Sequence, residues 1–394
     1  MATENNNKTL NVPNLRFPEF SGEWEKCTLG DITENFSRRN KEEIHYPMFS
    51  VTNNKGFIPQ SEQFEDREMV GEDIKAYKII HKDDFAYNPA RINVGSIAKY
   101  SGENPCMISS LYVCFKTNPK IDNDWMMQLL KTPKMNFYYN INGEGGVRVY
   151  LFYPNFARIR TSYPTLQEQQ KISSFLTLLD ERIVTQIKVI EDLKKLKSAI
   201  THSHFENSII KYPARYIGDC IEQVSRRNKN GEIDNVLSVS NKSGFITQSE
   251  QFEDREIASE DTTNYKVVRL NDFAYNPARI NVGSIARLQS SLPGIVSPMY
   301  VCFRTSHILL PEYFEHFFAT QYFKHEMHKR LEGSVRLCLT FDSLCNIKIA
   351  LPPIETQKQF SQQILALENK VRNEMTLLSM YQSLKQYFLS QMFI

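Results

Sequence analysis

The chain repeats itself at a fixed offset of 188 residues. The segment SRRNK at 37–41 returns at 225–229, and DFAYNPARINVGSIA at 84–98 returns at 272–286. Between residues 37 and 98, 39 of 62 positions are identical to their counterparts without a gap. A repeat of this length is far longer than a solenoid repeat and has the size of a domain. The sequence therefore predicts two copies of one domain-sized unit.

Each copy is predicted to begin with a globular part of the α+β class, at about 24–162 and 212–350. Turn-forming residues alternate there with short β-branched or aromatic runs, which is typical of α+β domains. The local elements expected in the first copy are a tight turn at 53–56, strands at 92–98 and 111–115, and a helix at 124–139. The second copy repeats the turn at 241–244 and the helix at 311–332.

A long helix is predicted to follow each globular part. Pro164 and Pro352 stand where the two helices would start, a position that proline favours, and helical spacing continues to about 204 and 392. Forty residues at 1.5 Å each make a rod of about 60 Å.

An apolar seam with heptad-like spacing runs along both predicted helices. Its positions are Leu176, Leu179, Ile183, Ile190 and Leu193 in the first helix, and Ile364, Leu367, Val371, Leu378 and Tyr381 in the second. Polar residues interrupt the seam at the same two steps, 186 and 197 in the first helix and 374 and 385 in the second. Matching seams favour an antiparallel coiled coil, which predicts a pseudo-two-fold relation between the globular parts. The alternative is that each helix covers only its own domain.

The overall charge gives no reason to expect a nucleic-acid partner. The chain has 47 basic and 45 acidic residues, a net charge of +2, so such a partner must be argued from local arrangement. The seven cysteines include no CxxC pair, and no apolar run is long enough for a secretory signal or a membrane span. We therefore expect a reduced, cytoplasmic protein.

The order of domain, long helix, domain and long helix resembles the specificity subunit of type I restriction–modification enzymes. The resemblance covers essentially the whole chain and rests on a combination of motifs, none of which is diagnostic alone. These motifs are LRFPEF at 15–20, Trp24, LGDI at 29–32, and the helix-start signatures YPTLQEQQKI at 163–172 and LPPIETQKQF at 351–360. The second signature has Thr356-Gln357 where the family usually has Glu-Gln.

This resemblance implies a non-catalytic DNA-reading subunit without a cofactor and without a membrane partner. Target-recognition domains at 1–162, which includes the N-terminal segment, and at 206–350 would each read half of a split site in double-stranded DNA. Spacer helices at 163–205 and 351–394 would dock two adenine-methyltransferase subunits and, indirectly, the restriction subunits.

Clusters of arginine, lysine and asparagine are the candidate DNA contacts. Arginine and lysine bind phosphate, arginine also pairs with guanine, and asparagine pairs with adenine edges. For the 37–41 cluster the alternative is a solvated basic turn, and for 87–93 it is a structural loop. The candidates in the first copy are Arg38, Arg39, Asn40, Lys41, Asn53, Lys55, Asn88, Arg91, Asn93 and Arg148. Those in the second copy are Arg226, Arg227, Asn228, Lys229, Asn241, Lys242, Asn276, Arg279, Asn281 and Arg336.

Catalytic and metal-binding motifs find little support in the sequence. The Asn-Pro pair at 88–89 is similar to the loop of amino-methyltransferases, but Arg91 stands where that loop needs an aromatic residue. His325 and His328 have a spacing that could bind a metal, yet their counterparts are Phe137 and Asn140, so we expect no metal site. The alternatives left open are a fused DNA methyltransferase or nuclease, and a coiled-coil scaffold that does not bind DNA.

The uneven divergence of the two copies bears on the target. Residues 99–111 and 116–144 have drifted far more from their counterparts than residues 84–98. If the base-reading residues lie in the matching segments, both domains read the same half-sequence and the target is close to an interrupted palindrome. A plainly asymmetric target would mean that the drifted segments do the reading.

Overall fold

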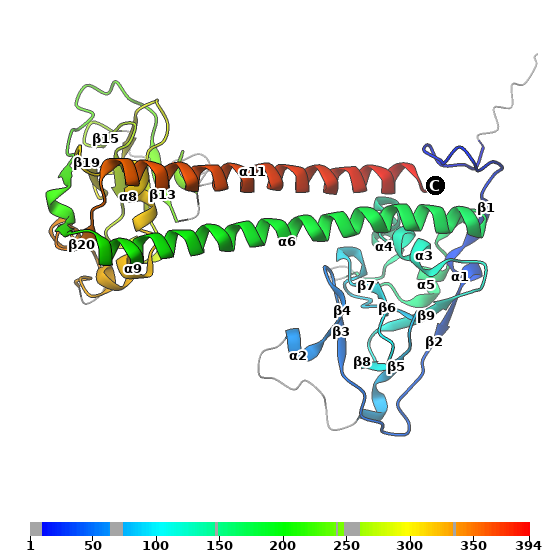
Figure 1. Cartoon of the computed structure of the whole chain (residues 1–394). Coiled ribbons are helices and arrows are strands. Elements are labelled where there is room, and N and C mark those ends of the chain that lie inside the picture. The colour runs from blue at the N-terminus through cyan, green and yellow to red at the C-terminus, as the bar shows by residue number, and fades with distance from the viewer. Residues whose placement is uncertain (1–9, 64–73, 146–148, 242, 248–260, 334–335) are drawn as a thin grey trace, which may run out of the picture. The chain divides into compact units, whose positions relative to one another are not determined.

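The fold is α+β, as predicted, and divides into two compact units. The computed structural model describes residues 10–63, 74–145, 149–241, 243–247, 261–333 and 336–394. Unit 1 comprises residues 1–187 together with 376–394, and unit 2 comprises residues 188–375. The described strands follow each other and pair in the same order in both units (Figure 1).

Ten short strands and several helices make up the globular part of unit 1. The strands are β1 (Glu25–Thr28), β2 (Thr33–Phe36), β3 (Phe49–Thr52), β4 (Gly56–Pro59), β5 (Lys78–Ile80), β6 (Phe85–Tyr87), β7 (Ile97–Lys99), β8 (Cys106–Ile108), β9 (Val113–Thr117) and β10 (Arg160–Tyr163). The helices are α1 (Leu29–Ile32), α2 (Gln60–Gln63), α3 (Asn123–Leu130), α4 (Pro133–Asn142), α5 (Tyr153–Ala157) and the 3-10 turns η1 (Ile74–Ala76) and η2 (Ile92–Val94).

Unit 2 repeats this arrangement. Its strands are β11 (Ala214–Tyr216), β12 (Ile221–Gln223), β13 (Leu237–Ser240), β14 (Gly244–Thr247), β15 (Lys266–Val268), β16 (Phe273–Tyr275), β17 (Ile285–Arg287), β18 (Gly294–Val296), β19 (Val301–Thr305) and β20 (Lys348–Ala350). Its helices are η3 (Ile217–Asp219), η4 (Ile280–Val282), α8 (Pro311–Phe317), α9 (Gln321–His328) and α10 (Phe341–Cys345). The main antiparallel sheets have the equivalent orders β2-β9-β6-β7 and β12-β19-β16-β17.

The segment most alike in the two copies forms the centre of each sheet. β6 pairs with β7 on one side and β9 on the other, and all three of its residues are fully buried. Phe85 stacks on Phe115 with ring centroids 5.0 Å apart, and Phe273 stacks on Phe303 at 5.1 Å. A strand that is paired on both sides tolerates little change because its neighbours fill the space around it. Much of the identity between residues 84–98 and 272–286 is therefore structural.

Three local predictions were wrong. The single helix expected at 311–332 is divided into α8 and α9. Residues 124–139 form two helices, α3 and α4, because Thr132 caps α4 through the Met135 amide and Pro133 follows as its first residue. Residues 92–98 are not a continuous strand, because the 3-10 turn η2 precedes β7. The tight turn at 53–55 forms as predicted between β3 and β4.

Two long helices, α6 (Leu166–Lys211) and α11 (Ile354–Gln391), start where the prolines predict. A buried glutamine near each start fixes the helix to its globular part. Gln169 accepts a hydrogen bond from the Asp122 amide (2.8 Å) and donates to the carbonyls of Lys120 and Pro164. Gln357 makes the equivalent bonds with Leu310, Ile308 and Pro352.

The departure of the second helix-start signature has a structural reason. In unit 1 the buried carboxylate of Glu168 accepts two hydrogen bonds from Arg16, each 2.7 Å, and one from the Trp24 indole at 3.3 Å. Adding the offset to Arg16 gives His204, which stacks on Phe360 at 4.0 Å instead. Unit 2 therefore lacks an arginine at the position that corresponds to Arg16. The counterpart of Glu168 in unit 2 is Thr356.

The long helices pack antiparallel in each unit, as predicted. In unit 1, Phe175 contacts Phe388, and Asp180 forms an ion pair with Lys385. In unit 2, Lys197 forms an ion pair with Glu368 at 3.1 Å, and His204 stacks on Phe360. Adding 188 to positions 180 and 197 gives 368 and 385, so the same ion pair recurs with the roles of the helices exchanged.

The burial of the helices follows the predicted seam. Leu176, Ile190 and Ile364 are buried, and the other seven seam residues are half-buried. The seam lysines 197 and 385 are the cations of the two ion pairs. Such partly exposed pairs contribute about 0.2–1 kcal/mol each, but a polar residue in a seam restricts the register.

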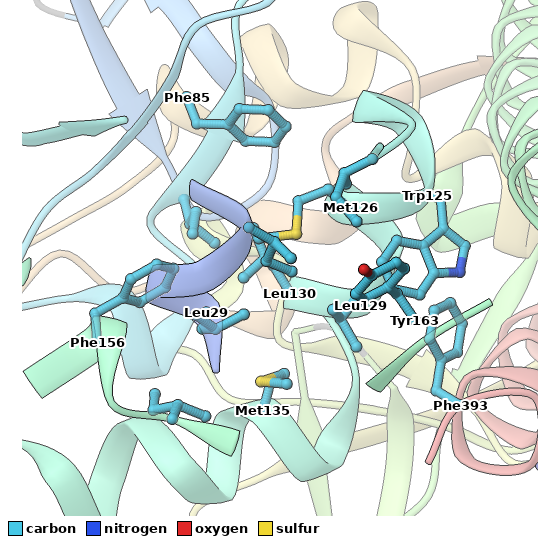
Figure 2. Packing of buried hydrophobic residues seen from close by; sticks show 14 of the residues in the cluster. Leu29, Phe85, Trp125, Met126, Leu129, Leu130, Met135, Phe156, Tyr163 and Phe393 are labelled. Atoms are coloured by element: carbon cyan, nitrogen blue, oxygen red, sulfur yellow. The ribbon is translucent and has the colours of Figure 1, made fainter. Parts of the chain in front are cut away.

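The end of α11 completes the hydrophobic core of unit 1. Phe393 packs against Trp24 and Trp125 with ring centroids 6.5 and 5.8 Å apart, and Tyr163 belongs to the same cluster. Figure 2 shows Phe393 beside Trp125 and Tyr163. Unit 2 has its own core around Phe273, Phe303 and Phe314. In the described part of the chain, no helix is long and apolar enough to cross a membrane.

We predict that His204 makes unit 2 sensitive to acid. Burial lowers the pKa of His204, and it also lowers the pKa of the nearby His316. The unfolded chain therefore binds these protons more readily, so stability is fully present above the ordinary histidine pKa of about 6.5 and is lost as the pH falls below it. His204→Met, which copies Met392 at the equivalent place in unit 1, should reduce the fall in melting temperature between pH 7.5 and 5.5.

The matched control is His307→Met, which removes an exposed histidine of the same unit. Calorimetry of both variants at the two pH values makes the comparison. An unchanged pH dependence in His204→Met would contradict the assignment.

Candidate nucleic-acid interface

The basic cluster of each unit is held along the edge of a short strand. The Ile79 amide of β5 donates to the Arg38 carbonyl at 2.7 Å, and Arg39 forms a β-bridge with Lys78. In unit 2 the Val267 amide donates to the Arg226 carbonyl at 2.8 Å, and Arg227 bridges to Lys266. These backbone bonds fix both clusters as extended segments, and their arginine and lysine side chains are exposed.

The asparagines of these clusters are structural, which corrects their assignment as DNA contacts. Asn40 is fully buried; its amide donates to the Ile44 carbonyl at 2.8 Å, and its oxygen accepts from the Ile44 amide at 3.1 Å. Asn228 is 4% exposed and closes the same turn through the backbone of Ile233. Neither amide is free to meet the edge of a base.

The first arginine of the cluster is neutralised in unit 1. Arg38 forms an ion pair with Asp84 at 2.9 Å and a hydrogen bond with His81. Its guanidinium also lies over the Phe36 ring, 4.6 Å from the centroid. Arg39 and Lys41 have no side-chain partner among the described residues. Unit 1 therefore presents these two cations to solvent.

The corresponding aspartate of unit 2 has a different partner. Asp272 forms an ion pair with Arg304 at 3.0 Å and accepts a hydrogen bond from the Arg269 amide at 2.9 Å. Burial raises the pKa of Asp272, while the Arg269 amide and Arg304 favour its charged form. Arg226 has no side-chain partner in the part of the chain that the structure describes, and Arg227 bonds the neutral amide of Asn264 at 3.0 Å.

A hollow of about 600 Å³ opens beside the basic cluster of unit 2. Its charged lining residues are Arg226, Arg227, Lys229, Arg269 and Glu232. A second hollow of about 270 Å³ shares Arg226 and Arg269 with the first and adds Arg304, Asp272 and Glu222. Cations prevail in the first hollow, so it suits an anionic ligand.

A second group of predicted residues gathers around the Asn-Pro turn. Asn88 accepts a hydrogen bond from the Ala90 amide at 3.0 Å, and Asn276 repeats this bond with Ala278. Gly95 follows with φ +99°, and a Cβ there would lie 3.5 Å from the Asn53 carbonyl. The turn that carries Asn53 and Lys55 therefore lies against the turn that carries Arg91, and both cations are exposed.

The two units differ at the second asparagine of the Asn-Pro turn. Asn93 donates to the side chain of Asn140 at 3.0 Å and is half-buried. Asn281 is exposed, and the counterpart of Asn140 in unit 2 is His328. Asn241 and Arg279 are exposed like their counterparts in unit 1, as is Arg336. The predicted contacts Arg148 and Lys242 lie outside the described residues.

Sequence reasoning missed Arg269 and Arg304, which line the hollows of unit 2. Their counterparts in unit 1 are His81 and Lys116, so neither belongs to a repeated motif. The signal that could have found them is the presence of arginine in the second copy where the first copy has another basic residue.

The described residues show no group of three or more His, Cys, Asp or Glu side chains that could hold a metal ion. All seven cysteines are free. Burial raises the pKa of the Cys114 and Cys302 thiols to about 12, so both stay protonated at neutral pH.

Comparisons with known proteins agree with one another. Residues 21–195 match the family model of the type I restriction modification DNA specificity domain. A type I restriction enzyme specificity subunit from Methanocaldococcus jannaschii, MjaX, is 23% identical over 400 residues, which cover 92% of this chain and 91% of that protein.

Two solved structures share the fold over nearly the whole chain. One is the S subunit of a type I restriction–modification system from M. genitalium, with a TM-score of 0.56, 13% identity and coverage of 97% of this chain and 99% of that one. The other comes from a study of complex assembly and conformational transition of the type I R-M system, with a TM-score of 0.58, 14% identity and coverage of 93% and 96%.

We predict that Asn40→Ala destabilises the protein. The substitution removes both hydrogen bonds between the buried Asn40 side chain and the Ile44 backbone, and each such bond contributes about 0.5–1.5 kcal/mol. Thermal unfolding should show a lower midpoint, whereas Asn53→Ala, at an exposed turn position, should leave it unchanged. Asn40→Ala with full stability and weaker DNA binding would restore the original assignment of Asn40 as a DNA contact.

Proposed function

Because residues 21–195 match the type I restriction modification DNA specificity domain and a specificity subunit is similar over nearly the whole chain, we propose that this chain is the DNA-reading subunit of a type I restriction–modification complex. One observation carries the proposal: both units present exposed cations at equivalent positions around the same two turns. Arg39, Lys41 and Arg91 are exposed in unit 1, and Arg227, Lys229 and Arg279 are exposed in unit 2. Arginine and lysine side chains displayed in this way bind the phosphates and base edges of duplex DNA.

The chain recognises DNA and leaves catalysis to its partners. Arg91 and Arg279 stand where an amino-methyltransferase loop needs a stacking aromatic residue. A guanidinium there favours DNA binding over methyl transfer by this chain. The net charge of +2 is small for a DNA-binding protein, so the partner subunits are expected to supply further contacts and to raise the affinity.

The target is a bipartite and nearly palindromic site in double-stranded DNA. The two units carry the same residues in the Asn-Pro turn and the same Arg-Arg-Asn-Lys cluster, so they are suited to two similar half-sequences. The helix contacts exchange roles between the units, which supports the predicted pseudo-two-fold relation. Proteins with two-fold symmetry bind half-sites of inverted orientation.

Apolar side chains outside the seam provide docking positions for two methyltransferase subunits. Leu196 and Leu384 are 47% and 42% exposed, and the offset of 188 relates them to each other. Ile187 and Met375 form a second related pair, at 40% and 51% exposed. Exposed apolar residues at equivalent places in two units favour two copies of one partner. The restriction subunits would join through those partners.

Mapping of methylated adenines in the host genome tests the proposed function. Disruption of this gene should abolish methylation at one bipartite motif whose halves are similar in inverted order. No lost motif, or loss of an uninterrupted motif, would contradict the function. A bipartite motif with unlike halves would keep the function and overturn the near-palindrome, because the drifted segments would then read the bases.

Assembly should depend on the exposed leucines of the long helices. We predict that Leu196→Asp combined with Leu384→Asp prevents co-purification with the methyltransferase subunit, because each change puts a charge on an apolar contact. Helix pairing should persist, since both side chains point away from the seam. The control is Lys194→Asp with Gln382→Asp, exposed polar positions two residues away. A stable complex containing the leucine variant would overturn the docking positions.

A further inference from the structure

The two Arg-Arg-Asn-Lys clusters have the same sequence but different electrostatic surroundings. In unit 1 the buried carboxylate of Asp84 is satisfied by Arg38 of the cluster itself. A phosphate that approached Arg38 would compete with this carboxylate and with the Phe36 ring. Arg38 therefore stabilises the fold through its ion pair with Asp84, and this pair adds little net positive charge to the surface.

In unit 2 the equivalent aspartate is satisfied from another strand. Residue 304 on β19 is arginine, and it holds Asp272 with hydrogen bonds of 3.1 and 3.2 Å. The counterpart on β9 is Lys116, which pairs with Glu34 at 3.1 Å instead. Because Arg304 forms the ion pair with Asp272, the guanidinium of Arg226 remains available to bind a ligand.

A second difference adds a cation beside Arg226. Residue 269 is arginine, whereas its counterpart in unit 1 is His81, which bonds Arg38. Arg226 and Arg269 line both the hollow of about 600 Å³ and its smaller neighbour. Arg227 and Lys229 line only the larger one, where Glu232 is the one lining carboxylate. Guanidinium groups that share a concave surface without a carboxylate partner are suited to phosphate oxygens.

We propose that this hollow of unit 2 is a phosphate-binding site for the DNA backbone, and that unit 1 has no equivalent of the same strength. The proposal rests on the proposed function and adds an asymmetry to it. The two units read similar bases, but unit 2 contributes more of the binding free energy through its phosphate contacts. Damage to the half-site or to the backbone under unit 2 should weaken binding more than the same damage under unit 1.

A pair of equivalent substitutions tests this asymmetry. Arg226→Ala and Arg38→Ala are made in the full chain and assembled with the methyltransferase subunits. The affinity for duplex DNA carrying the mapped motif is measured from low to high salt, and thermal unfolding is followed in parallel. Each lost phosphate contact lowers the slope of log affinity against log salt by about one.

The two variants should differ in both measurements. Arg226→Ala should lower the salt slope by about one and leave the melting temperature unchanged, because its side chain has no partner in the described residues. Arg38→Ala should lower the melting temperature, because Asp84 loses its ion pair, and should change the salt slope much less. Equal changes of slope, or no change with Arg226→Ala, would overturn the proposal.

Exchange of residues between the units gives a second test that does not require Arg38→Ala to fold. Arg269→His with Arg304→Lys gives unit 2 the residues of unit 1, and the salt slope should fall. His81→Arg with Lys116→Arg makes the reverse change, and the slope should rise by about one. The absence of either change would overturn the asymmetry. Failure of the unaltered complex to bind the motif would overturn the proposed function itself.

Discussion

The antiparallel packing of α6 on α11 is the constraint on which the rest of the structure depends. Each unit contains a segment of both helices, so unit 1 is completed by the C-terminal part of α11 and is not a continuous stretch of chain. The paired seam residues and the ion pairs of Asp180 with Lys385 and Glu368 with Lys197 fix how the helices lie against each other. The buried amides of Gln169 and Gln357 then tie each globular part to the start of its helix.

Duplication gave this chain two copies of one scaffold, and later substitutions gave the copies different surfaces. The shared residues are largely those of the central strands and the turns that they support, so the geometry of these turns is retained in both copies. A few substitutions outside the shared motifs redirect the ion pairs around Asp84 and Asp272. As a result the same arginine serves the fold in one unit and is available to a ligand in the other.

The repeat, the long helices and their seam could be predicted because each has a periodic signal in the sequence. The Thr-Pro pair at 132–133 marks the start of α4, but the helical pattern of the sequence continues across it and hides the break. The roles of Asn40 and Arg38 could not be predicted, because their partners depend on the folded turn and on Asp84, 46 residues away. An asparagine or arginine in a turn has the same local pattern whether it supports the turn or binds DNA.

The central claim is that the two units, which derive from one repeat, bind two separate halves of a DNA site. Hydroxyl-radical footprinting of the assembled complex on its mapped site tests this most directly. The account predicts two protected tracts separated by a less protected spacer, with Arg226→Ala weakening protection in one tract only. A single continuous tract, or equal weakening of both tracts by Arg226→Ala, would contradict it.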